Sequence, residues 1–476
     1  MRKNAAPALL ALILLLSASP ALAGLDVKMA GDVRIYGSFF GNQNFTGWNA
    51  TGTKTDEPFV IWQRFRLRTD FKANDSLAFR LGLRVNDSNW GGPQYRVDTP
   101  DVDLEVYQAY LQFKIPGTDA KVTAGLQPVS LPHSAPFFDS PVLASKQASN
   151  SSTALIIETP IVKDRVSAVL GFDRLVDANQ RYDTDTTQVA DEIDAYFAAF
   201  PLTMDGLSLT PWTMAVVAGK DADAPTVVRN NMVSGGSFLS GGADNQTFYW
   251  WGGGTMEIAA FDPVYVYADL IYGQGGMGGA DRLKRWGWFA DAALQYRGLD
   301  FMTPQLGVWW SPGEDASLTN GSERMPAVTG YFGMAGNFLF PCGQYFTKDN
   351  LAVDPIGSFG ATFAITEISL LDRLTNRLSF TAMSGTSSAA GLRKAVLASG
   401  GNGQYLTMGK NLAEGEWIVS ATLDGSYEIY QNLALQLETG WAKFTGYDAS
   451  TWNYYRDFTG AVQDSWKVMF GLTYKF

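Results

Sequence analysis

The sequence predicts an all-β chain that closes into a transmembrane antiparallel β-barrel of about 16–18 strands. Three observations lead to this prediction. Apolar and polar residues alternate in many short segments, an apolar leader precedes these segments, and long and short connections alternate between them. Beyond the leader, no apolar run is long enough for a transmembrane helix. A sheet that spans a membrane must pair all its backbone groups, so the predicted strands have to form a closed ring.

The chain begins with the pattern of an export signal. Arg2 and Lys3 precede an apolar run that ends at Leu16, and small residues including Ala21 and Ala23 follow. This order is typical of a cleaved signal peptide over residues 1–23, and the apolar run is too short to anchor the chain in a membrane. We therefore expect export from the cytoplasm and a barrel domain over residues 24–476.

The composition argues against several classes of protein. The 476 residues include 36 basic and 47 acidic ones, and the formal net charge of −11 argues against a nucleic-acid partner. A single cysteine, Cys342, excludes an internal disulfide framework. A single histidine, His133, leaves little material for a metal site or a hydrolase triad. We therefore expect no enzyme, no catalytic residues, no metal and no other cofactor.

Strand-like alternation recurs from residue 33 to the last residue of the chain. It is found in segments 33–40, 65–72, 77–85, 106–115, 120–127, 166–172, 264–272, 285–296, 359–365, 416–430 and 433–441. In the terminal segment one face carries Trp466, Val468, Phe470, Leu472, Tyr474 and Phe476. Successive side chains of a strand point to opposite faces, so these residues would all contact lipid. The polar residues between them would line a lumen.

The connections between these segments alternate in length. Long ones occupy residues 43–59, 87–103, 128–152, 220–245, 313–355 and 387–413, whereas short turns occupy 72–76, 115–119, 297–300 and 430–432. Long extracellular loops opposite short periplasmic turns are typical of an outer-membrane barrel. Tryptophans near the expected strand ends would form a belt at the membrane interfaces: Trp62, Trp250, Trp251, Trp286, Trp309, Trp417 and Trp441.

The last three residues give a resemblance to a known family. Tyr474 and Phe476, separated by Lys475, resemble the C-terminal signature by which outer-membrane proteins are recognised for barrel assembly. With the leader and the loop pattern, the whole mature chain resembles the bacterial general porins, especially the homotrimeric porins of sulfate-reducing bacteria. The resemblance implies an outer-membrane location and a homotrimer. It also implies contact with outer-membrane lipids and lipopolysaccharide, and delivery to the barrel-assembly machinery.

One long connection matches the plan of that family in its position. In general porins the third long loop folds into the barrel and narrows it. Here residues 128–152 follow the fifth predicted strand, Lys121–Gln127, and contain His133, Phe137, Phe138 and Asp139. We expect this segment to be the constriction loop. The alternative is an extracellular loop that stays outside the lumen.

Five arginines fall on the polar face of two neighbouring strands. They are Arg64, Arg66, Arg68, Arg80 and Arg84, and we expect them to line the pore. If Phe71 pairs with Leu77 across the turn, Arg68 faces Arg80 and Arg64 faces Arg84. Like charges directly opposed are destabilising, so such an arrangement indicates a use that outweighs its cost. Alternatively, Asp70, Asp139 and other lumen acids neutralise these arginines.

These features together predict a passive diffusion channel for small hydrophilic solutes and ions. An alternative is a substrate-selective channel for anionic or carboxylate solutes. Two weaker alternatives are a barrel hydrolase, for which His133 would have to be the base, and an adhesin or structural barrel with a plugged lumen.

Overall fold

The computed structural model describes most of the chain. The described residues are 25–43, 45, 59–98, 101–134, 136–137, 139–144, 151–177, 191–220, 222, 246–277, 284–317, 319–334, 338–340, 345–346, 348–398, 408–452 and 462–476. The predicted signal peptide, Phe138 and Cys342 lie outside them. Neither helix in the described part of the chain is long and apolar enough to cross a membrane.

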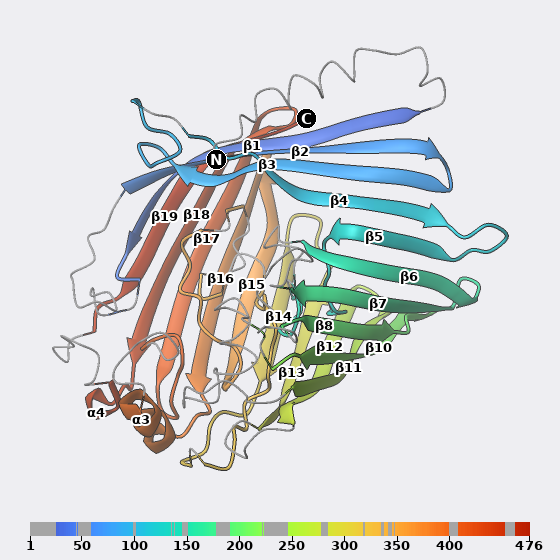
Figure 1. Cartoon of the computed structure of the whole chain (residues 1–476). Helices are drawn as coiled ribbons and strands as arrows, with labels where there is room; N and C mark the ends of the chain where they lie inside the picture. The colour runs from blue at the N-terminus through green and yellow to red at the C-terminus, as the bar shows by residue number, and fades with distance from the viewer. Residues whose placement is uncertain are drawn as a thin grey trace.

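A single antiparallel sheet makes up nearly all the regular structure (Figure 1). Its strands are β1 (Asp26–Gly41), β2 (Phe59–Asn74), β3 (Leu77–Asn89), β4 (Glu105–Lys114), β5 (Lys121–Gln127), β6 (Ser152–Val162), β7 (Val166–Val176), β8 (Ile193–Ala199), β9 (Leu202–Met204), β10 (Leu207–Ala218), β11 (Thr247–Phe261), β12 (Val264–Met277), β13 (Arg285–Tyr296), β14 (Thr303–Trp310), β15 (Ser358–Leu371), β16 (Leu374–Gly385), β17 (Trp417–Tyr430), β18 (Leu433–Thr445) and β19 (Ser465–Lys475). The helices are α3 (Ala389–Ala398) and α4 (Ala449–Trp452).

The sheet is a closed barrel of 18 strands, as the sequence predicts. The short β8 and β9 both pair with β7 and with β10, so the two form one interrupted strand. The last strand, β19, pairs with β1 from Asp32 opposite Lys475 to Gly41 opposite Trp466. Beyond this ladder, Gly31 and Phe476 exchange two backbone hydrogen bonds of 2.8 and 3.1 Å. The final residue of the chain is therefore held by the first strand.

The two faces of the strands differ as the alternation predicts. On β19, Phe470, Leu472, Tyr474 and Phe476 are exposed on the outer face. Lys467, Met469 and Thr473 on the inner face are buried. A large apolar outer surface of this kind is stable only against lipid or another apolar surface. The buried inner face means that the lumen is largely filled.

The connections separate into two kinds, at the two rims of the barrel. The turns that follow β2, β6, β11, β15 and β17 are short, and both chain ends lie at the rim of these turns. Long connections lie at the other rim, and they include 128–151, 311–357 and 386–416. Helices α3 and α4 lie together at this loop rim (Figure 1).

The predicted tryptophan belt is wrong in part. Trp286, Trp417 and Trp441 are exposed on the outer face near the loop rim, as expected for a belt. Trp251 and Trp309 are instead buried on the inner face. Trp62 also points inward, where it packs beside Tyr36 and Phe346. The sequence places a residue near a strand end, but a shift of one position decides which face it occupies.

Candidate functional site in the barrel lumen

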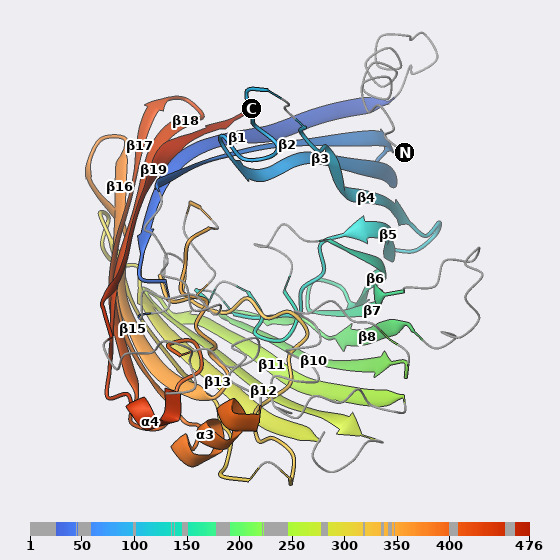
Figure 2. The same cartoon turned by 60° about the vertical axis from the view of Figure 1, so that its left-hand side comes forward.

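Two long loops enter the lumen and contact each other there. One is the predicted constriction loop, which spans residues 128–151, and the other spans residues 311–357 between β14 and β15. Tyr331 N–H donates to the Ser140 carbonyl at 3.0 Å, and Val328 N–H donates to the Val142 carbonyl at 2.8 Å. Figure 2 looks into the barrel and shows chain segments inside the ring of strands. These backbone bonds make the two loops one unit.

Loop 128–151 reaches the inner face of the wall at β12, β13 and β14. Phe137 packs near Gly307 of β14 and stacks on Phe332 of the second loop at 5.3 Å. Ser134 N–H donates to both carboxylate oxygens of Asp269 on β12, at 3.1 and 3.2 Å. His133 Nε2 lies 3.1 Å from Asp291 Oδ2 on β13. Loop 128–151, which follows β5, therefore crosses the interior and contacts a distant part of the barrel wall.

The charge of His133 follows from these neighbours. Its side chain is only 3% exposed, and its Nδ1 lies 3.6 Å from Asp269 Oδ1. Burial alone would lower the pKa of His133, but the carboxylates of Asp291 and Asp269 outweigh burial and raise it to about 9. Asp139, also buried, accepts a hydrogen bond from Ser140 N–H at 3.0 Å. The predicted residues His133, Phe137 and Asp139 thus lie in the interior, whereas Phe138 is not described.

Loop 311–357 fills the part of the lumen beside β18, β19 and β1. Phe346 is fully buried and stacks on Tyr36 of β1 at 4.4 Å. Its N–H donates to Glu438 Oε1 of β18 at 3.0 Å. Phe338 packs so closely on β18 that a Cβ at Gly440 would lie 2.5 Å from its ring. The sequence analysis did not predict that this loop enters the barrel.

The predicted arginine face is present, but its register differs from the predicted one. Phe71 pairs with Phe79 rather than Leu77, so Arg66 faces Arg84 and Arg80 faces Asp70. The observed pairing differs from the predicted one by two residues, and the ladder has a separate one-residue shift between Lys72 and Asn74 at the turn. A shift of two keeps all the arginines on one face, because the side-chain period of a strand is two.

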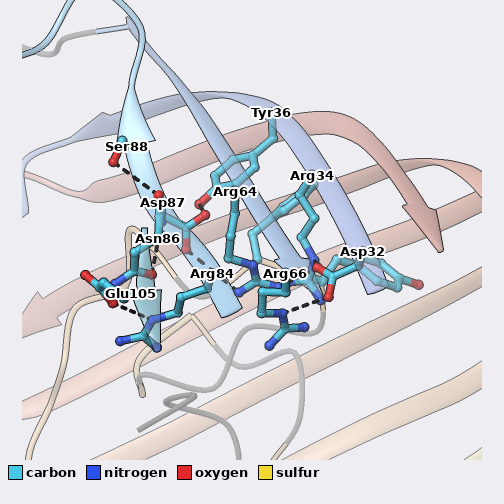
Figure 3. A network of polar contacts seen from close by, with 12 residues as sticks. Asp32, Arg34, Tyr36, Arg64, Arg66, Arg84, Asn86, Asp87, Ser88 and Glu105 are labelled. Atoms are coloured by element: carbon cyan, nitrogen blue, oxygen red, sulfur yellow. Dashed lines mark hydrogen bonds and ion pairs between the residues drawn. The ribbon is translucent and has the colours of Figure 1, made fainter. Parts of the chain in front are cut away.

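Acidic residues neutralise part of this face, which Figure 3 shows with its neighbours on β1. Arg66 Nε donates to Asp32 Oδ2 at 2.7 Å, and Arg64 Nη2 donates to Asp32 Oδ1 at 3.1 Å. Arg80 pairs with Asp70, and Arg84 pairs with Glu105 at 2.7 Å. The expected partner Asp139 lies with His133 at a cavity beside loop 128–151. The sequence analysis also missed Asp32 and Arg34, which β1 places directly beside β2.

We call a group of ten charged residues on β1, β2, β3 and the first residue of β4 the arginine wall. It consists of six arginines and four carboxylates: Arg34, Arg64, Arg66, Arg68, Arg80, Arg84, Asp32, Asp70, Asp87 and Glu105. Arg68 is exposed and, among the described residues, forms no ion pair. Arg34 faces Arg64 across the ladder, and its guanidinium donates to the Tyr345 carbonyl of the second loop. The wall therefore keeps an excess of positive charge.

Open space remains on both sides of the two loops. A cavity of about 560 Å³ extends from Arg34 and Tyr345 to Arg373, Asn432 and Lys475 at the short-turn rim. A second cavity of about 420 Å³ lies between loop 128–151 and the wall at β7 and β8, and His133 and Asp139 line it. Polar side chains beside such spaces are placed to contact a solute.

Comparisons with known proteins relate the chain to outer-membrane barrels through structure. No protein-family model and no curated protein matches it. The outer membrane protein opdK from Pseudomonas aeruginosa aligns at a TM-score of 0.53 with 10% identity, over 95% of this chain and 98% of that one. OccK5 (OpdH) of the same organism gives 0.52 with 12% identity, over 95% and 98%. OccD3 (OpdP) gives 0.50 with 12% identity, over 97% of each chain. These likenesses show that this chain has the fold of an outer-membrane β-barrel.

Proposed function

We propose that this chain is an outer-membrane channel through which small hydrophilic solutes diffuse passively, with a preference for anions such as small carboxylates. The observation that carries this proposal is the arginine wall. It holds more positive than negative groups, and Arg34 borders a cavity that extends to the short-turn rim. In a narrow lumen the field of such a wall is screened less than on an open surface.

The anion-selective alternative is favoured over a wide general porin. Loops 128–151 and 311–357 occupy much of the lumen, and both have buried aromatic residues at their contact. A solute must therefore pass close to charged side chains. Diffusion selective by charge is expected from a narrow path, whereas a wide aqueous lumen discriminates mainly by size.

The weaker alternatives find less support. A hydrolase would need His133 at the surface of a substrate cleft, but both ring nitrogens face buried carboxylates. A structural barrel with a plugged lumen is favoured by the two infolded loops and opposed by the cavities beside them. A homotrimer, contact with lipopolysaccharide and barrel assembly through Tyr474 and Phe476 remain predictions from the resemblance.

A planar-bilayer recording tests the proposal. We expect the purified protein to conduct, with a reversal potential in a salt gradient that indicates anion preference. Replacing Arg66 and Arg68 together by Gln removes two positive charges and keeps hydrogen-bonding groups. The reversal potential should then move toward cation preference, most clearly at 0.01 M salt, where the Debye length is about 30 Å.

The matched control is Arg165→Gln, because Arg165 is exposed in the turn between β6 and β7. It should leave the reversal potential unchanged. If the double variant behaves like this control at low salt, the arginine wall does not line the conducting path. If the wild-type protein does not conduct at all, the plugged structural barrel replaces the channel.

A further inference from the structure

We infer that His133, Asp269 and Asp291 form a binding site for a divalent transition-metal cation of the Zn²⁺ type. The three residues come from three separate segments: His133 from loop 128–151, Asp269 from β12 and Asp291 from β13. A bound metal would join the loop to the barrel wall. This inference does not depend on the proposed transport.

The spacing of the three side chains fits a single ion. One ligand atom from each residue can be chosen so that all three lie within 4.8 Å of one another. Asp269 and Asp291 face each other in the ladder between β12 and β13. Ligand atoms about 2 Å from a metal lie roughly 3–4 Å apart, and an imidazole nitrogen with two carboxylate oxygens is a usual set for Zn²⁺.

Four buried polar atoms of this cluster, on His133 and Asp291, have no hydrogen-bond partner among the described residues. His133 Nε2 is 3.1 Å from Asp291 Oδ2, but no hydrogen bond of acceptable geometry joins them. Both ring nitrogens of His133 and both oxygens of Asp291 are buried without a hydrogen-bond partner among the described residues. Leaving such groups unpaired is costly, and most costly where they are charged. A cation held by one ring nitrogen of His133 and by a carboxylate oxygen of Asp291 would give each of these two residues a partner.

The charges of the cluster also point to a divalent cation. Within the described part of the chain, no lysine or arginine forms an ion pair with Asp269 or Asp291. Asp269 and Asp291 face each other directly in a buried place, so two carboxylates lie together there without a lysine or arginine partner among the described residues. A divalent cation carries the charge that balances two carboxylates.

The surroundings provide orientation and access. Ser134 donates its N–H and its hydroxyl to Asp269, which fixes the direction of that carboxylate. Hydrogen bonds of this kind commonly orient metal ligands and strengthen binding. The cavity of about 420 Å³ beside loop 128–151 reaches His133 and is also lined by Ser130 and Asp139. An ion could therefore reach the cluster from the lumen. The sequence analysis expected no metal site because it considered His133 alone.

The test measures metal binding by the full-length barrel in detergent. The protein is stripped with a chelator, titrated with Zn²⁺ and analysed for bound metal by mass spectrometry. Co²⁺ serves as a second probe because its visible absorption reports its ligands. We expect one Zn²⁺ per chain. Ser134→Ala removes the hydroxyl donor to Asp269 but keeps the backbone N–H donor, so it should weaken binding by about 10-fold, and His133→Ala, which removes a ligand, should weaken it by more.

The matched control is Asp173→Asn, since Asp173 is a fully buried carboxylate on β7 that accepts a hydrogen bond from Ser152. It should bind Zn²⁺ like the wild-type protein. His133→Ala changes only a loop residue, so the barrel should still fold, and retained far-ultraviolet circular dichroism checks this. Equal Zn²⁺ affinity in the wild type and His133→Ala would overturn the inference. A wild-type protein that binds no Zn²⁺ would also overturn the inference, because His133 would then be the only possible cationic group of the cluster.

Discussion

The arginine wall and the opposite part of the same lumen use similar residues in different ways. On the inner faces of β16 to β19, Arg377, Asp424, Glu438 and Lys467 form a second charged group, which we call the sealed wall. All four are at most 5% exposed. On the arginine wall, the side chains of Arg66 and Arg80 keep 23% and 33% of their surface exposed.

The difference comes from what covers each wall. Loop 311–357 lies on the sealed wall, where Phe338 is 5.7 Å from Lys467 and Tyr345 and Phe346 donate to Glu438. The same loop contacts β1 and β2 through Arg34, Tyr36 and Trp62. It leaves Arg68 exposed. The charged side chains of the lumen therefore form two sets. Those that loop 311–357 covers stabilise the fold, and those that it leaves uncovered can contact solutes.

Breaking the sealed wall should have the largest effect on stability. Lys467 Nζ pairs with Glu438 Oε2 at 3.1 Å, and both side chains are almost fully buried. Lys467→Met leaves Glu438 as a buried charge without its cation, which should cost about 3–5 kcal/mol. The measurement is unfolding of the barrel in detergent, with protease cleavage of loop 311–357 as a second readout.

The control for this prediction lies on the same strand. Lys475→Met changes an exposed lysine at the end of β19 and should shift stability by no more than about 0.5 kcal/mol. If Lys467→Met unfolds at the same denaturant concentration as Lys475→Met, the sealed wall does not stabilise the barrel.

A buried carboxylate at the loop rim, Glu416, is covered like the sealed wall, but within the described ranges no lysine or arginine forms an ion pair with it. Glu416 accepts hydrogen bonds from Ala413 N–H and Trp452 Nε1, and Asp448 lies nearby. Burial raises the pKa of Glu416 to about 7, which outweighs the hydrogen bonds. A raised pKa of an acid means that the folded state prefers the protonated form. Stability should therefore fall by about 3 kcal/mol as pH rises from about 4.5 to about 7.

Glu416→Gln keeps the shape of the side chain and removes its titration. The difference in stability between the variant and the wild type should change over this pH range and be constant above it, as measured by thermal unfolding in detergent. A difference that is independent of pH would show that folding does not raise the pKa of Glu416.

Breaking an open pair should have the smallest effect. Arg80 Nη2 donates to Asp70 Oδ2 at 2.7 Å, but both side chains are about one third exposed. Arg80→Gln should cost no more than about 1 kcal/mol in the same unfolding assay, because water and salt screen the pair. A cost as large as that of Lys467→Met would mean that exposure is not what distinguishes the two walls.

The sequence predicts the barrel well because a period of two survives in nearly every strand. The arginine face was predicted for the same reason, and it tolerated an error of two residues in the register between Phe71 and Leu77. The inward positions of Trp251 and Trp309 were not predicted, since an error of one residue at a strand end reverses the face.

The arrangement inside the barrel could not be predicted from the same signal. Loop 311–357 has no strand or helix period, although its apolar residues Met325, Phe332, Phe338, Phe340 and Phe346 give a hint that it is buried. The cluster of His133, Asp269 and Asp291 joins residues far apart in sequence, and only the closed ring brings them together. Contacts across a lumen depend on the path of the loop, which local patterns do not encode.

The contacts of loop 311–357 also have a consequence for the order of assembly. The loop contacts Glu438 of β18 and Tyr36 of β1, and its Lys348 contacts Trp62 of β2. From inside the barrel it therefore spans the seam at which the first and last strands pair. That seam joins residues more than 400 positions apart, the costliest kind of closure for a folding chain. Because loop 311–357 contacts both sides of the seam, it keeps the first and last strands together and lowers the entropic cost of closing the ring. Closure of the ring and narrowing of the lumen are therefore coupled steps of folding.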